Sequence, residues 1–179
     1  MLTEQELHHI FSWLPYREDW TVDRNKIDAN IENFYGGLIK KFIENKLFET
    51  YYSENGGLGN YLEFFCFPRE DNLYKGNSIV VCISLCAPVA AYGQTTVYKT
   101  ANSFGWGKLF SPENINLVSD PKLKEIEKEI RNIIEDHKLS LLDQELVSKQ
   151  LPSEIVRSLK SENHNDGSQY LHGIFQKID

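Results

Sequence analysis

The segment that most constrains the fold is the run SIVVCISLC at residues 78–86. It has the length of a β-strand and is apolar almost without interruption, which is typical of a central strand covered on both faces. Two strand-like segments flank it, YLEFFCF at 61–67 and VAAYGQTTVYKT at 89–100. Aromatic and β-branched residues favour a pleated sheet, so the middle of the chain predicts one, with residues 69–77 as a connection.

Helical periodicity precedes and follows these strands. Residues 3–14 carry apolar residues three and four apart, and Thr3 and Glu6 have the spacing of a capping box. The same periodicity predicts a longer helix over residues 26–50. Asp120 followed by proline is a strong N-terminal signal, so a further helix is predicted from there to residue 138.

The C-terminal part predicts a short helix before Pro152 and then a β-hairpin. Residues 153–162 and 168–178 flank the dipeptide Asp166-Gly167, which favours a tight turn between two strands. Strands that come in runs, instead of alternating with helices, indicate the α+β class. We therefore expect a single α+β domain over residues 1–179. Its mainly antiparallel sheet of five to six strands is expected to pack against helices from the N-terminal and central segments.

Charge and composition exclude several classes of function. The chain has 19 basic and 26 acidic residues, a formal net charge of −7, whereas nucleic-acid binders need a basic surface to neutralise phosphates. An acidic surface suits a basic partner protein, so we expect a protein partner and no nucleic acid. No apolar run reaches the roughly 20 residues of a membrane helix, and the N-terminus lacks the pattern of a secretory signal. A cytoplasmic protein without a membrane partner is the resulting expectation.

No motif for catalysis, metal or cofactor binding is present. The cysteines Cys66, Cys82 and Cys86 lie in apolar segments, where a thiol behaves as a small hydrophobe. The sequence contains no CxxC, HExxH or G-x-S-x-G pattern, and GWGK lacks the rest of a phosphate-binding loop. We therefore predict no metal, no cofactor and no catalytic residue, although a site assembled from scattered residues leaves an enzyme open.

The candidate binding residues lie in and around SFGWGKLF at residues 103–110. They are aromatic residues interleaved with glycine, followed by one lysine: Tyr92, Tyr98, Phe104, Trp106 and Lys108. One interpretation is a recognition loop with Trp106 as the anchor. The other is that the Trp106 ring folds back to cap the core and the glycines only allow the turn.

Three functions remain from this sequence. The first is a small acidic interaction protein without catalytic activity, for example an inhibitor or immunity-type partner of a basic toxin or nuclease. The second is a small-molecule binder or enzyme with a pocket between sheet and helices, lined by Tyr92, Tyr98, Trp106 and Lys108. The third is a subunit whose N-terminal helices pair with a second copy; the sequence leaves the oligomeric state open.

Overall fold

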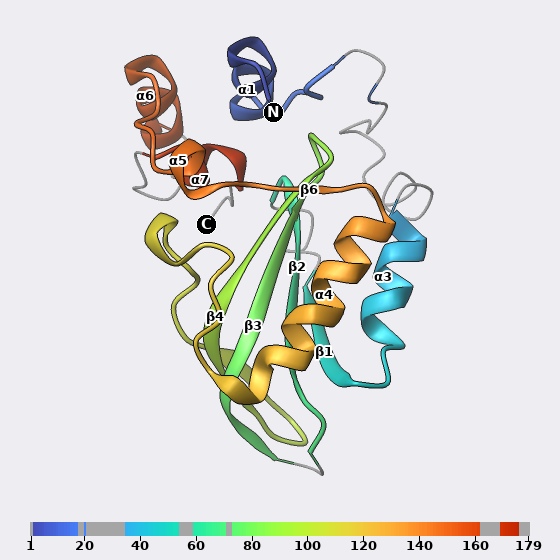
Figure 1. Ribbon diagram of the computed structural model, residues 1–179. Helices are drawn as coiled ribbons and strands as arrows, with labels where there is room; N and C mark the ends of the chain where they lie inside the picture. Colours follow the sequence, from blue (N-terminus) through green and yellow to red (C-terminus); the bar gives the residue numbers. More distant parts are fainter. Residues whose placement is uncertain are drawn as a thin grey trace.

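The computed structural model describes residues 2–17, 20, 35–53, 59–70, 73–161 and 169–175. Along this chain the strands occur mainly in one run between helices, and six strands form one mostly antiparallel sheet (Figure 1). This arrangement confirms the α+β fold class and the number of strands expected from the sequence.

The sheet is a meander, in which strands that follow one another along the chain lie side by side. Its first five strands, each antiparallel to the next, are β1 (Phe48–Ser53), β2 (Tyr61–Pro68), β3 (Tyr74–Ser84), β4 (Val89–Lys99) and β5 (Phe104–Trp106). The short strand β6 (Ser140–Leu141) joins β4 in parallel, beside Val89 and Ala90. Strands β1 and β5 consequently stand at the two ends of the main strand order.

Strand β3 lies in the middle of the sheet, and both of its faces are covered. Its residues alternate between two apolar clusters: Ile79 and Val81 belong to one, Val80 and Cys82 to the other. Because successive side chains of a strand point to opposite faces, a strand with a core on each side has to be apolar throughout. The prediction drawn from SIVVCISLC is therefore confirmed.

Strand β3 begins earlier than the sequence indicates. Residues 74–77, which the sequence assigns to a connection, pair with residues 96–99 of β4. In addition, Asn77 Nδ2 donates a hydrogen bond to Asp120 Oδ2 at 2.8 Å. Strand β4 is long enough to bond to the backbone N–H and C=O groups of this polar segment and so keeps it extended. The composition of the segment alone does not show this effect.

Two helices cover one face of the sheet. Helix α3 (Gly36–Ile43) and helix α4 (Lys124–Asp136) lie side by side across it (Figure 1). Phe42 of α3 stacks on Phe64 of β2, with ring centroids 4.4 Å apart. The isoleucines of α4 that face the sheet are all buried: Ile126, Ile130, Ile133 and Ile134. This is the first of the two cores.

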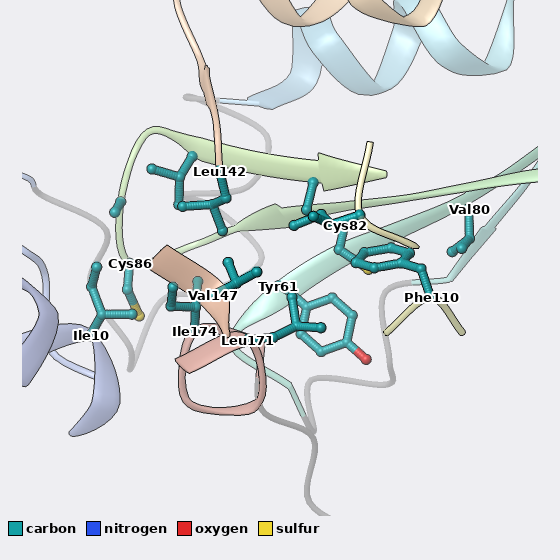
Figure 2. Packing of buried hydrophobic residues seen from close by; sticks show 14 of the residues in the cluster. Ile10, Tyr61, Val80, Cys82, Cys86, Phe110, Leu142, Val147, Leu171 and Ile174 are labelled. Atoms are coloured by element: carbon teal, nitrogen blue, oxygen red, sulfur yellow. The ribbon is translucent and has the colours of Figure 1, made fainter. Parts of the chain in front are cut away.

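Helix α1 (Glu4–Phe11) and the short helices α5 (Gln144–Val147) and α7 (Tyr170–Ile174) cover the opposite face. Figure 2 shows this second core, where Ile10, Val147 and Leu171 gather with residues of β2 and β3. The sheet separates the two cores, so its inner strands have a packed layer on each side.

Polar side chains cap the N-terminal ends of two helical segments at the positions that the sequence predicts. Thr3 Oγ1 accepts the N–H of Glu6 at 3.3 Å, and Glu6 Oε2 accepts the N–H of Thr3 at 2.7 Å, which is the expected capping box. Asp120 Oδ1 accepts the N–H of Lys122 at 2.9 Å and starts the 3₁₀ turn that leads into α4. Both helix starts are confirmed.

Two helix ends differ from the sequence prediction. The helix predicted to residue 50 ends at Ile43, because Asn45 Oδ1 accepts the N–H of Leu47 at 2.9 Å and forms a local turn before β1. Residues 26–34 of that predicted helix lie outside the described residues. Near the N-terminus the helix ends at Phe11, three residues early, so Leu14 is half-exposed instead of sharing the buried stripe.

The predicted C-terminal β-hairpin is wrong for the residues that the structure describes. Ser153–Ser161 forms helix α6, and the second predicted strand contains α7. Leu171 and Ile174 are three residues apart and both buried in the second core, as one helix face requires; in a strand they would point to opposite faces. The expected turn at residues 163–167 lies outside the described ranges.

Gly93, in the middle of β4, permits a close contact within the second core. A Cβ atom placed on Gly93 would lie 2.3 Å from the Cβ of Phe110, far inside van der Waals contact. Phe110 is buried against the sheet at this point. The ring can lie so close to β4 because residue 93 has no side chain.

Candidate functional site

The edge strand β5 holds the aromatic residues of SFGWGKLF in place. Phe104 pairs with Lys99 of β4, and Trp106 pairs with Val97. Paired residues of neighbouring strands project to the same face of a sheet. Phe104 and Trp106 therefore lie on the face of Val97, which belongs to the second core.

Phe104 and Trp106 form an aromatic cluster with Tyr51 of β1 and Phe65 of β2. The rings of Tyr51 and Phe104 stack with their centroids 3.9 Å apart and an interplanar angle of 12°. The ring of Trp106 lies 5.0 Å from that of Phe65. Phe65 is buried, whereas Tyr51 is 40% and Trp106 43% exposed. The cluster thus has a buried base and an open outer side, so Trp106 both packs on the core and faces solvent.

Tyr98 and Lys108 lie beside β5 as well. Tyr98 is 46% exposed and, being next to Val97 in β4, lies on the opposite face from Trp106. Lys108 is exposed, and its carbonyl accepts a hydrogen bond from Thr95 Oγ1 at 2.8 Å. These contacts fix the backbone on which the lysine is carried.

A groove of about 600 Å³ runs along β5 on the side of Tyr98. Its lining comes from β3, β4, β5 and the residue that follows β5: Lys75, Gly76, Thr96, Val97, Tyr98, Gly105, Trp106 and Gly107. A Cβ placed on Gly105 would meet no atom within 4 Å, so the groove is open at this point. Glycine here leaves the main chain of β5 accessible to a partner.

A second groove, of about 410 Å³, lies between β1 and the β4–β5 turn. Its lining includes Glu49, Tyr51, Lys99, Asn102 and Phe104. Lys99 Nζ donates to Glu49 Oε1, and the ammonium group of Lys99 lies 5.9 Å from the ring centroid of Phe67. The ion pair joins strands that are not neighbours in the sheet, as the Tyr51–Phe104 stack does.

Tyr92 does not belong to this site. It is fully buried in the first core, under α4, and its hydroxyl donates to Glu127 Oε1 at 2.9 Å. Burial, followed by the bond to the Glu127 carboxylate, raises the pKa of Tyr92 and keeps the hydroxyl protonated. Glu127 is also bonded by Lys124 Nζ at 2.9 Å. The structure brings together Tyr98, Phe104, Trp106 and Lys108 around β5, and places Tyr92 in an internal polar network.

Tyr51 is the site residue that sequence reasoning missed. The sequence placed it just beyond the end of a predicted helix, and only the pairing of β1 with β2 carries it to Phe65, its partner in the register. The pair Tyr51-Tyr52 has strong β-propensity, which is the one local signal for a strand at this position.

A third pocket, of about 400 Å³, lies between α1, the β3–β4 turn and α5. Its polar lining includes Glu6, Arg17 and Asp143, and its apolar lining includes Leu142 and Leu146. Arg17 Nε donates to Glu6 Oε1 at 2.5 Å. The N–H of Thr3 and then the Arg17 guanidinium lower the pKa of Glu6 to about 2, so this carboxylate is ionised at neutral pH.

The described residues offer little for metal or thiol chemistry. Among them, no group of three or more His, Cys, Asp or Glu side chains is placed to hold a metal ion. Cys66, Cys82 and Cys86 are buried, and burial raises the pKa of the Cys66 and Cys82 thiols. A raised pKa keeps these two as thiols, the less nucleophilic form.

Comparisons with protein-family models, with curated proteins and with solved structures gave no significant match to this chain. None of the helices in the described ranges is long and apolar enough to cross a membrane.

Proposed function

We propose that this chain is a small acidic protein-interaction domain without catalytic activity, which binds another protein around strand β5. The observation that carries the proposal is the aromatic cluster: the rings of Tyr51 and Trp106 are held by Phe104 and Phe65 and are 40% and 43% exposed. Ordered aromatic side chains lose little conformational entropy on binding, and they dominate the energy of many protein contacts.

The electrostatics support a more specific form of this proposal. A net charge of −7 attracts a basic protein over long range, as expected for an inhibitor or immunity-type partner of a basic toxin or nuclease in the cytoplasm. Lys75 and Lys108 are positively charged and lie close to β5. The carboxylates that attract a basic partner would therefore lie on the rest of the surface. Association with a basic partner should therefore slow as ionic strength rises.

The test compares capture of partner proteins by the wild-type chain, by Trp106→Ala and by Leu117→Ala. Leu117 is also an exposed large apolar residue, but it lines neither groove beside β5. We expect Trp106→Ala to weaken the affinity for a captured partner by about 2 kcal/mol and Leu117→Ala to leave it unchanged. Equal binding by all three proteins would contradict the proposed surface.

A second candidate function, small-molecule binding, is favoured by the pocket that contains Glu6 and Arg17. This pocket combines charged and apolar lining in about 400 Å³, the composition typical of ligand sites. Thermal unfolding in the presence of a library of small polar compounds tests it, with Leu142→Trp as the variant that fills the pocket. A compound that raises the Tm of the wild-type chain but not of Leu142→Trp would support this function.

A further inference from the structure

Two backbone hydrogen bonds at the ends of β5 define which of its N–H and C=O groups point towards β4. The N–H of Thr100 donates to Ser103 O at 2.8 Å, and the N–H of Gly107 donates to Thr96 O at 2.8 Å. In an antiparallel pair, positions bonded to the partner strand alternate with positions whose N–H and C=O point away from it. These two bonds therefore fix the alternation along the whole of β5.

Phe104 and Trp106 occupy the positions that point away from β4. Gly105, between them, faces Tyr98 and is bonded within the ladder. Among the described residues, no strand pairs with the other edge of β5, and the main-chain groups of Phe104 and Trp106 make no backbone hydrogen bond. Strand β5 thus presents two outward N–H and two outward C=O groups, the pattern that an added strand recognises.

We propose that an extended segment of another protein adds to β5 as a further strand and bonds to the main chain of Phe104 and Trp106. This inference rests on the proposed protein-binding function and specifies how the partner is held. One groove contains Phe104, and the other contains Gly105 and Trp106. Side chains of an added strand point alternately to its two faces, so each groove receives one set of them.

The lining of the grooves indicates the chemistry of the segment. On the face of the aromatic cluster, Tyr51 and Trp106 offer half-exposed rings that suit an apolar residue. On the other face, Lys75 is the one charged residue among the described residues that line the groove, and the exposed Lys108 comes directly after the lining residue Gly107. A carboxylate therefore suits this side. A second copy of this chain is disfavoured as the occupant, because copies with a net charge of −7 repel each other.

Hydrogen exchange of the full chain tests the proposal, with the synthetic peptide Ac-Thr-Val-Asp-Val-Asp-Val-Thr-NH₂ as probe, whose valines share one face of the strand and whose aspartates share the other. We expect the peptide to slow exchange of the Phe104 and Trp106 amides by about tenfold or more, and to change that of Gly105 much less. The same peptide with its three valines N-methylated, or with its two aspartates N-methylated, keeps the side chains but loses the central N–H donors of one edge. One of the two methylated peptides should lose all protection. Failure of the parent peptide to protect these two amides overturns strand addition.

A matched pair of variants separates the contribution of the Trp106 backbone N–H to peptide binding from that of the indole ring. Trp106→Ala and Trp106→Pro both remove the indole, but only proline removes the outward N–H, and an edge position that points outward tolerates proline. We expect Trp106→Pro to bind the peptide about three- to tenfold more weakly than Trp106→Ala, since one net hydrogen bond is lost. Protection of the Gly107 amide in both variants verifies that the β4–β5 ladder is intact. Equal affinities in the presence of an intact ladder contradict the proposal.

The outcomes distinguish this inference from the function on which it rests. In one outcome, Trp106→Ala no longer binds a captured protein partner, while the Phe104 and Trp106 amides of the wild-type chain stay unprotected in its complex with that partner. The proposed binding surface is then correct and strand addition is wrong. If Trp106→Ala keeps the partner at full affinity, the proposed function itself is contradicted. Protection of both amides that grows with protein concentration in the absence of peptide, together with dimers in sedimentation, would assign the edge to a second copy and overturn the proposed occupant.

Discussion

The rings of Tyr51 and Phe104 stack at 3.9 Å, although their strands, β1 and β5, stand at opposite ends of the main strand order. Two strands so far apart in a flat sheet would have side chains well beyond contact, since neighbouring strands are about 4.8 Å apart. The sheet must therefore curl strongly at this end, so that the side chains of β1 and β5 meet. The Glu49–Lys99 ion pair bridges β1 and β4 in the same way.

A double-mutant cycle on Tyr51→Ala and Phe104→Ala measures what this contact contributes. We expect a coupling free energy of about 0.5–1.5 kcal/mol, because the stacked rings interact directly. Urea unfolding of the four proteins gives the value. Tyr51→Ala combined with Tyr98→Ala is the matched control: Tyr98 is an exposed tyrosine on the other face, so the two effects should add.

Trp106→Ala should reduce the free energy of unfolding by about 1–2 kcal/mol, since the ring is 43% exposed and only its inner side packs on Phe65. Phe65→Ala, which removes the buried base of the same cluster, should cost about 3–5 kcal/mol. Chemical denaturation of both variants provides the comparison. A Trp106→Ala loss as large as that of Phe65→Ala would show that Trp106 acts as a core residue and would weaken its role as an anchor.

Glu6 makes the stability of the fold depend on pH in the acid range. Its pKa is about 2 in the folded chain, below the ordinary value of 4.5, because the Thr3 N–H and Arg17 stabilise the carboxylate. A lowered folded pKa means that the stabilisation is complete above pH 4.5 and is lost as the pH falls towards 2. We expect Glu6→Gln to be less stable at neutral pH and to lose less stability over this interval.

The measurement for Glu6 is the urea midpoint as a function of pH. Glu4→Gln removes a carboxylate from the same turn of α1 and controls for the change in net charge. If Glu6→Gln and the wild-type chain lose stability in parallel between these pH values, the Thr3 and Arg17 contacts do not control the titration of this carboxyl.

Gly93→Ala should destabilise the protein by about 1–3 kcal/mol or more, because the added methyl group overlaps the Cβ of Phe110 and one backbone has to move. Gly105→Ala is the matched control in the adjacent strand: its Cβ meets nothing within 4 Å, so stability should change by about 0.5 kcal/mol or less. Thermal unfolding of the two variants measures this difference as a difference in Tm. Equal Tm values for both would mean that the Phe110 contact is easily relaxed.

Local sequence was sufficient to predict those elements whose own residues determine their structure. The run at 78–86 has to be a covered strand because it is apolar on both faces, and Thr3 and Glu6 cap α1 through contacts within one turn. The C-terminal hairpin failed because Asp166-Gly167 favours a turn whatever precedes it, while packing on the second core decided that residues 153–161 and 170–174 are helical.

The candidate site was predictable in part. Phe104 and Trp106 stand out as aromatic residues next to glycines, and the structure places both on an edge strand with open grooves. Tyr51 joins them through the curl of the sheet. Tyr92 lies five residues before Val97, the partner of Trp106, so its side chain points to the opposite face and into the other core. Both outcomes depend on strand register, which one sequence does not specify.

The division of the interior by the sheet has an evolutionary consequence. A substitution that shrinks a side chain around Phe42 can be compensated only by its neighbours beneath α3 and α4, because the strand backbones block access from the far compartment. The two compartments can accordingly drift in sequence at separate rates and under separate selection. Distant descendants of this chain should preserve the continuous apolar character of β2 and β3 long after the individual residues on either side have been exchanged.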